Sequence, residues 1–167
     1  MDRRGVLAGG LLGLASPASA ASQGSAGATS GAAGDLPARF AAALNAHDID
    51  AFAALFAEDY INHQTSAATP PPAAPVRPKE ASVAFFRQRL IGLPDLRVIV
   101  EASLAQGALC AASFVYEGTH QGPYFGVPPT GRSLRFTSCD IFRVEGGLIA
   151  EHWGMGDAAG IVAQLRR

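Results

Sequence analysis

The stretch that decides the fold runs from Gly118 to Asp157 and reads GTHQGPYFGVPPTGRSLRFTSCDIFRVEGGLIAEHWGMGD. β-branched, aromatic and polar residues alternate along 133–144 and 148–153, which predicts two β-strands. The glycines at 146–147 indicate a tight turn between them. A Gly- and Pro-rich connection over 121–132 joins the first of these strands to another that precedes it. The stretch therefore predicts a meander of long antiparallel strands.

Upstream of the meander, apolar residues recur at helical spacing. Start and stop signals such as Asp35 before the first apolar face and Gly92 after the last one bound these segments. The predicted helices cover 35–46, 49–56 and 79–92, the additional strands cover 96–101 and 109–120, and Asp157 can cap a final helix to Leu165. Helices first and strands afterwards predict an α+β fold, with the helices on one face of a curved antiparallel sheet.

Length and charge limit the classes of function. A chain of 167 residues suits one domain with a core of its own. Thirteen basic and fourteen acidic residues give a net charge of −1, so nothing favours nucleic acid or an acidic membrane as a partner. Strand parity places Cys110 and Cys139 on opposite faces, which favours two small apolar side chains over a disulfide.

The N-terminus has the pattern of an export signal. Residues 1–20 begin with charges, continue with a short apolar run and end in Ala18-Ser19-Ala20, which predicts a secretory signal peptide. The adjacent Arg3 and Arg4 favour the twin-arginine route to a periplasmic or secreted location; a retained N-terminal anchor is the alternative. Residues 21–34 predict a flexible leader, so the domain covers 35–167 and needs no membrane after processing.

Four motifs in the last third of the chain occur together and in order. They are GTH at 118–120, G-x-x-P-T-G at 126–131, DIFR at 140–143 and EHW at 151–153. With them the chain resembles the SnoaL-like polyketide cyclases, also called ester cyclases, of the nuclear-transport-factor-like superfamily. The resemblance implies a cone of sheet and helices around a pocket for a small hydrophobic molecule, without cofactor. It also implies a homodimer that pairs through the outer sheet face, at Arg135, Thr137 and Ile141.

Strand parity selects Asp140 as the first candidate for catalysis. Asp140 shares a face with Phe136, Ser138 and Phe142, where a carboxyl group is out of place. Because burial favours the protonated form of a carboxyl group, such an acid can exchange protons near neutral pH. An equally weighted alternative is a structural Asp bonded to a neighbouring Arg or His.

His120 is a candidate partner for this acid. It ends the preceding strand, on the face of Phe114 and Tyr116, where an imidazole can accept or donate a proton. We expect these aromatic side chains to line the pocket together with Phe136, Ser138, Asp140 and Phe142. A hydrogen bond that only anchors the following loop is the alternative for His120.

His152 and Trp153 point to opposite faces of a regular strand, so one of them lines the pocket. The resemblance favours His152, although a bulge would reverse the choice. Asn62 and His63 are similar to polar residues that the family places near its ligand; with Tyr60 they would otherwise only fix a turn. The histidines and Asp140 lack the close spacing of metal ligands, so no metal is expected.

One position departs from the family. In its antibiotic-pathway cyclases, aldol ring closure depends on an Asp, and the resemblance places that acid at Gly154. Two functions therefore stay open. The first is an acid/base enzyme acting on a small hydrophobic carbonyl or polyketide-like compound, with Asp140 as base and His120 or His152 as partner. The second is a non-catalytic exported module that binds a small molecule.

Overall fold

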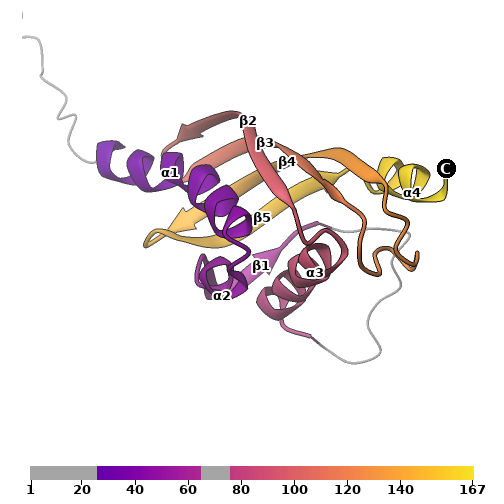
Figure 1. Ribbon diagram of the computed structural model, residues 1–167. Coiled ribbons are helices and arrows are strands. Elements are labelled where there is room, and N and C mark those ends of the chain that lie inside the picture. Colours follow the sequence, from indigo (N-terminus) through magenta and orange to yellow (C-terminus); the bar gives the residue numbers. More distant parts are fainter. Residues whose placement is uncertain (1–25, 65–75) are drawn as a thin grey trace, which may run out of the picture.

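Five strands form one sheet in the order β1–β5–β4–β3–β2 (Figure 1). The computed structural model describes residues 26–64 and 76–167. Its strands are β1 (Phe56–Asn62), β2 (Arg97–Gln106), β3 (Leu109–Thr119), β4 (Ser133–Glu145) and β5 (Leu148–Gly156). The pairs from β2 to β5 are antiparallel, as the alternation predicts, whereas β1 runs parallel to β5. The sheet is therefore mixed rather than purely antiparallel.

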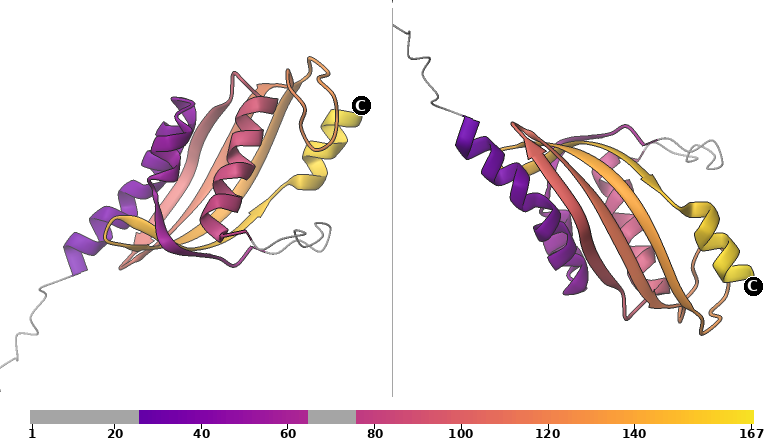
Figure 2. Two further views of the ribbon diagram at one scale, coloured as in Figure 1. Left: turned by 90° about the horizontal axis from the view of Figure 1, so that it is seen from below. Right: turned by 90° about the horizontal axis from the view of Figure 1, so that it is seen from above.

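The helices gather mainly on one face of this sheet. They are α1 (Ala26–Asn45), α2 (Ile49–Ala53), α3 (Pro78–Gly92) and α4 (Ala158–Arg166). In the right-hand view of Figure 2 the strands lie in front of α3, and their near face carries no helix over β3 and β4. We call these the inner face, toward α3, and the outer face. The α+β class with helices on one face is confirmed. No helix among the described residues is long and apolar enough to cross a membrane.

Phe40 on α1 is the centre of the inner core. Its ring lies 5.0 Å from the Phe52 ring and 5.0 Å from the Phe114 ring, measured between centroids. It also contacts Phe86 at 5.4 Å and Phe142 at 5.7 Å, so α1, α2, α3, β3 and β4 all meet around one side chain. Edge-on and tilted ring contacts of this kind add to the free energy gained by burying apolar area.

The first helix begins earlier than the composition predicted. Residues 26–34 were expected to belong to a flexible leader, but α1 starts at Ala26. Alanine is the strongest helix former, and Ala33 and Leu36 are both fully buried against the core, so tertiary packing extends the helix toward the N-terminus. The predicted signal peptide, 1–20, and the leader residues 21–25 lie outside the described residues.

The second correction concerns β1. The sequence predicted a helix over 49–56 and then a turn leading into a brief extended segment, whereas α2 ends at Ala53 and a full strand begins at Phe56. The register between β1 and β5 shifts between Phe56 and Ile61. Such an irregularity interrupts the two-residue alternation by which a strand is recognised. Phe56 and Tyr60 are nevertheless buried and fix β1 against the core.

Two side-chain amides bind strand backbone at positions that no neighbouring strand covers. The Asn45 amide, at the end of α1, donates to the Val98 carbonyl oxygen at 2.9 Å and accepts from the Val98 N–H at 2.7 Å. On α4, the Gln164 amide does the same with the Arg135 backbone, at 2.9 Å in both directions. The helices before and after the sheet are thus attached to its margins by backbone hydrogen bonds.

Candidate active site

Asp140 and His152 form a close pair on the inner face. Asp140 on β4 pairs with Gly154 on β5, so His152, two residues earlier, points to the same side. The His152 Nε2 lies 2.8 Å from the Asp140 Oδ1, and the two side chains are 13% and 10% exposed. The pair is therefore sheltered but within reach of solvent. The stacking of the His152 ring on Phe142, with centroids 4.9 Å apart, holds the imidazole in place.

Each end of the pair has a further hydrogen-bonding partner. The Ser138 Oγ lies 2.6 Å from the Asp140 Oδ2, and the Tyr60 hydroxyl oxygen lies 3.3 Å from the His152 Nδ1. The Ser82 Oγ on α3 is 3.4 Å from the same Tyr60 oxygen. Four elements, β1, α3, β4 and β5, thus contribute to one polar chain.

The protonation of Tyr60 follows from its burial. Desolvation raises the pKa of Tyr60 to about 12, so its hydroxyl group keeps the proton near neutral pH. The hydroxyl oxygen lies 3.3 Å from the Nδ1 of His152, so it can donate this proton there. With its own proton on Nε2, His152 can in turn donate to the Asp140 carboxylate at 2.8 Å. Both contacts are compatible with one tautomer of His152.

Gly154 makes this pair sterically possible. A Cβ atom at position 154 would lie 2.3 Å from the Asp140 Oδ1 and 2.5 Å from the His152 Nε2. Both distances are far below van der Waals contact, so any side chain there would separate the two groups. The family resemblance implies an acid at position 154. Here the space that its side chain would fill is taken by the hydrogen bond between Asp140 and His152.

The neighbour of His152 points the other way. Trp153 lies on the outer face and stacks on His63, with centroids 4.5 Å apart and planes at 3°. The His63 Nε2 lies 2.6 Å from the Glu151 Oε2, and these contacts with His63 and then Arg143 lower the pKa of Glu151. His152 is therefore the inward residue, as the resemblance favoured, whereas Trp153 lies on the outer face with His63 and lines a hollow there. Asn62 lies nearer the pair, with its amide nitrogen 3.4 Å from the Ser82 Oγ.

His120 is not a partner of Asp140. Asp140 is opposite Ala112 on β3, eight residues before His120. At roughly 3.3 Å per residue, this is about 25 Å along the strand. His120 is fully buried, and its Nδ1 accepts the Thr130 N–H at 3.2 Å while lying 2.9 Å from the Thr130 Oγ1. These contacts agree with the alternative interpretation, in which His120 anchors the loop that follows it.

Most of the residues expected to line a deep pocket belong to the packed core. Phe114, Tyr116, Phe136 and Phe142 are at most 3% exposed. They pack on one another and on Phe40, so only Ser138, at the margin of this group, is half-buried. The expectation of a wide apolar cavity among these rings is therefore wrong for these four.

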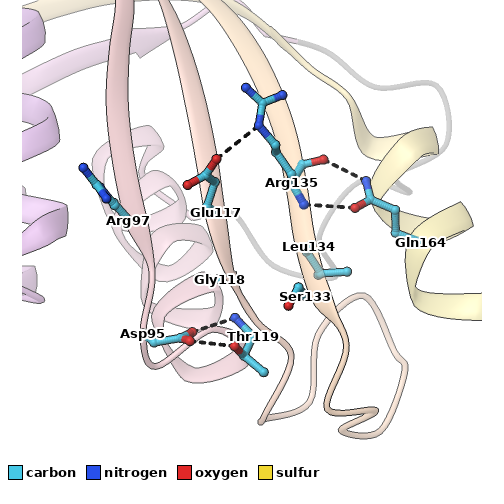
Figure 3. Close-up of a pocket in the computed structure, with 9 residues that line it drawn as sticks. All are labelled: Asp95, Arg97, Glu117, Gly118, Thr119, Ser133, Leu134, Arg135 and Gln164. Atoms are coloured by element: carbon cyan, nitrogen blue, oxygen red, sulfur yellow. Dashed lines mark hydrogen bonds and ion pairs between the residues drawn. The ribbon is translucent and has the colours of Figure 1, made fainter.

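Two hollows occur on the outer face. One, of about 580 Å³, has apolar walls that include Leu104, Ile141, Trp153 and Met155. The other, of about 510 Å³, is polar, and its residues are labelled in Figure 3. There Glu117 pairs with Arg135 at 3.1 Å, and both Asp95 oxygens bind Thr119 at 2.6 Å. Most of its polar groups therefore bind one another, whereas the Arg97 side chain makes no such contact within the hollow.

Sequence reasoning missed Tyr60, Ser82 and Arg89 as members of the inner polar surface. Arg89 is only 5% exposed although it carries a charge. The sequence contained one indication of this burial. Arg89 follows Phe86 by three residues, so both lie on the same face of the helix. Tyr60 was considered only as part of a turn because β1 was not recognised. Among the described residues, no three side chains of the usual ligand types converge as a metal site requires.

The Gly154→Ala substitution tests the pair directly. We expect the new methyl group to push Asp140 and His152 apart and to leave a buried carboxylate short of one donor, at a cost of about 1–3 kcal/mol in the free energy of unfolding. Chemical denaturation measures that cost, and the imidazole nitrogen NMR shifts of His152 report the lost bond. Gly156→Ala, on the same strand with open space around its Cβ, is the matched control. An unchanged His152 spectrum in Gly154→Ala would contradict the role of Gly154.

Comparisons with known proteins agree with this architecture. The sequence profile of the SnoaL-like polyketide cyclases matches residues 35–165. IdmH from Streptomyces antibioticus is 31% identical, with a TM-score of 0.64 over 80% of this chain and 98% of its own. TsrD from Streptomyces laurentii is 27% identical, with a TM-score of 0.67 over 81% and 95%.

AclR from Streptomyces galilaeus, at 22% identity, has a TM-score of 0.69 over 82% of both chains and shares the fold. No curated protein matches the sequence significantly. The profile match covers the whole of the sheet described above together with most of the helical segments that flank it. The chain therefore belongs to the SnoaL-like polyketide cyclase family.

Proposed function

We propose that this protein is a cofactor-independent acid/base enzyme that removes a proton next to the carbonyl group of a small hydrophobic, polyketide-like compound. The observation that carries the proposal is the sheltered Asp140–His152 pair, for which Gly154 leaves space. Membership of a cyclase family supports the same chemistry. Abstraction of such a proton needs a placed base and a group that stabilises the oxyanion, so no cofactor is required.

In the proposed reaction Asp140 is the base. Each carboxylate oxygen accepts one hydrogen bond in the free protein and retains a lone pair for the substrate proton. The substrate C–H bond breaks, its proton moves to the Asp140 carboxylate, and the electron pair moves to the carbonyl oxygen as an enolate. The enolate carbon then attacks a second carbonyl carbon of the same molecule, and the new alkoxide takes the proton back. His152, held by Tyr60, keeps the carboxylate oriented throughout.

The Asp140→Asn substitution tests this role. We expect it to lower the rate of solvent-deuterium incorporation beside the carbonyl of a ketone panel by at least about 100-fold, because the amide cannot accept the proton. Proton NMR in D₂O measures the rate. The control is Glu145→Gln, which changes an exposed carboxylate at the end of the same strand. A reduced melting temperature with an unchanged exchange rate would show that Asp140 is only structural.

The second candidate is a non-catalytic module that binds a small apolar molecule. The glycine at position 154, where the family resemblance implies the acid needed for ring closure, favours it. The same ketone panel separates the two functions, since a binding module gives ligand-dependent stabilisation without deuterium exchange in the unmodified protein.

We also propose export with removal of residues 1–20, supported by Arg3, Arg4 and the Ala18-Ser19-Ala20 site. The expected outcome is a mature chain that starts at Ala21 and accumulates outside the cytoplasm of a host with a working twin-arginine pathway. Intact-mass spectrometry of each fraction checks it. Replacing Arg3 and Arg4 by Lys should retain the precursor inside, and a chain that still starts at Met1 outside the cytoplasm would contradict the proposed cleavage.

A homodimer through the outer face is the third proposal. Leu104 and Met155 are 69% and 75% exposed there, beside Ile141 and Trp153, and such apolar groups on a sheet face suit a second copy. We expect light scattering at micromolar concentration to give the mass of two chains and Met155→Asp to give one. The control is Glu101→Lys on β2. A monomer for the unmodified protein would remove this proposal.

A further inference from the structure

Arg89 is a buried cation within the inner face. It lies on α3, is 5% exposed, and its Nε donates to the Tyr124 hydroxyl at 3.1 Å. Among the described residues, no carboxylate forms an ion pair with it. A guanidinium group without a carboxylate partner is costly to bury, so its surroundings must explain how it is retained.

Aromatic rings surround the guanidinium. Its central carbon lies 4.5 Å from the centroid of the Tyr116 ring and 4.8 Å from that of Phe86. Phe85 and Phe136 follow at 4.9 and 5.1 Å. Ring faces attract a cation and so offset part of the lost hydration. The ring faces offer no acceptor to its in-plane N–H groups; the Nε–H donates to Tyr124, and the Tyr116 hydroxyl group is within reach of the guanidinium.

The terminal nitrogens of Arg89 are not sealed in. In the part of the chain that the structure describes, the Nε2 of His120 is the one fully buried side-chain nitrogen or oxygen atom without a hydrogen-bonding partner. The two terminal nitrogens are not in that class, so beyond the contact with the Tyr116 hydroxyl group they border space that solvent can enter. Phe85 is 46% exposed, so a single ring separates the cation from bulk solvent on one side.

The cation and the acid of the proposed active site are close neighbours. The Tyr116 hydroxyl oxygen lies 3.4 Å from the Ser138 Oγ, which lies 2.6 Å from the Asp140 carboxylate. Burial raises the pKa of Tyr116 to about 12, and the nearby Arg89 cation opposes that rise. Two hydrogen bonds thus join Asp140 to the Tyr116 hydroxyl group, and Arg89 on α3 lies over the ring of the same tyrosine.

We propose that Arg89 binds the anionic oxygen of the ligand, and that the ligand is a planar organic anion, such as a carboxylate or the enolate of an acidic carbonyl compound. This inference rests on the proposed function for its catalytic part. When Asp140 takes the proton, the electron pair that reaches the carbonyl oxygen is stabilised by the two terminal nitrogens of Arg89. The planar fork of the guanidinium matches the two oxygens of a carboxylate, and a neutral ligand gains less from it.

Binding of 2-naphthoate and its neutral isostere 2-naphthamide, measured by isothermal titration calorimetry on the full mature chain, tests the proposal. We expect the unmodified protein to bind naphthoate at least about ten-fold more tightly than the amide, because the hydrogen bonds to the anion are charge-assisted. Arg89→Gln should remove that preference. Arg89→Lys should keep part of it, because it retains the charge without the planar fork. Arg87→Gln, an exposed arginine on the same helix, is the matched control and should change nothing.

Equal affinity for the two probes, binding of neither probe, or an undiminished preference in Arg89→Gln would each overturn the proposal. Should Arg89→Gln fail to fold, the comparison of the two probes on the unmodified protein and on Arg89→Lys still decides. Failure of the enzyme proposal is distinguishable, because it shows in deuterium exchange. A protein that prefers naphthoate but exchanges no ketone proton keeps the anion site and loses the catalytic role.

Discussion

Burial of a carboxylate at Asp140 is the constraint on which the inner face depends. Burying an ionised group without hydrogen bonds costs free energy and destabilises the folded state. Here Ser138 and His152 supply the hydrogen bonds. His152 in turn needs a partner for its second nitrogen, which Tyr60 provides from a different strand. The parallel attachment of β1 to β5 is what brings Tyr60 there. The polar side chains of β1, α3, β4 and β5 are thus connected to one buried carboxylate by a chain of hydrogen bonds.

The same reasoning explains why the interior is at once densely packed and polar along one line. The rings around Phe40 supply most of the apolar area buried by the helices. The polar chain crosses the inner face at its half-buried margin, where Ser82 and Ser138 remain in contact with solvent. Groups that are oriented before a ligand arrives require no rearrangement during a proton transfer. The apolar core and the proposed active site therefore lie in adjacent regions of one face.

Residue alternation was sufficient to predict the inner face of β4, because a regular strand has a strict period of two and Phe136, Ser138, Asp140 and Phe142 follow it. It could not predict which distant residues meet Asp140. His120 shares its side of the sheet, yet the two lie far apart along β3 and β4, a separation that depends on strand register. The strand β1 was not predicted because its pairing with β5 is irregular. The burial of Arg89 was not predicted because charged residues are usually exposed.

The amides of Asn45 and Gln164 have a consequence for the solubility of the protein. Strand β2 ends the sheet on one side, and the first residues of β4 extend beyond β5, so both places present backbone groups to which a foreign strand can add. Each amide occupies a donor and an acceptor of that backbone, as an adjoining strand would. Growth of the sheet into a fibre at either place would first have to detach a helix. Addition of a foreign strand is thereby hindered at Val98 and at Arg135.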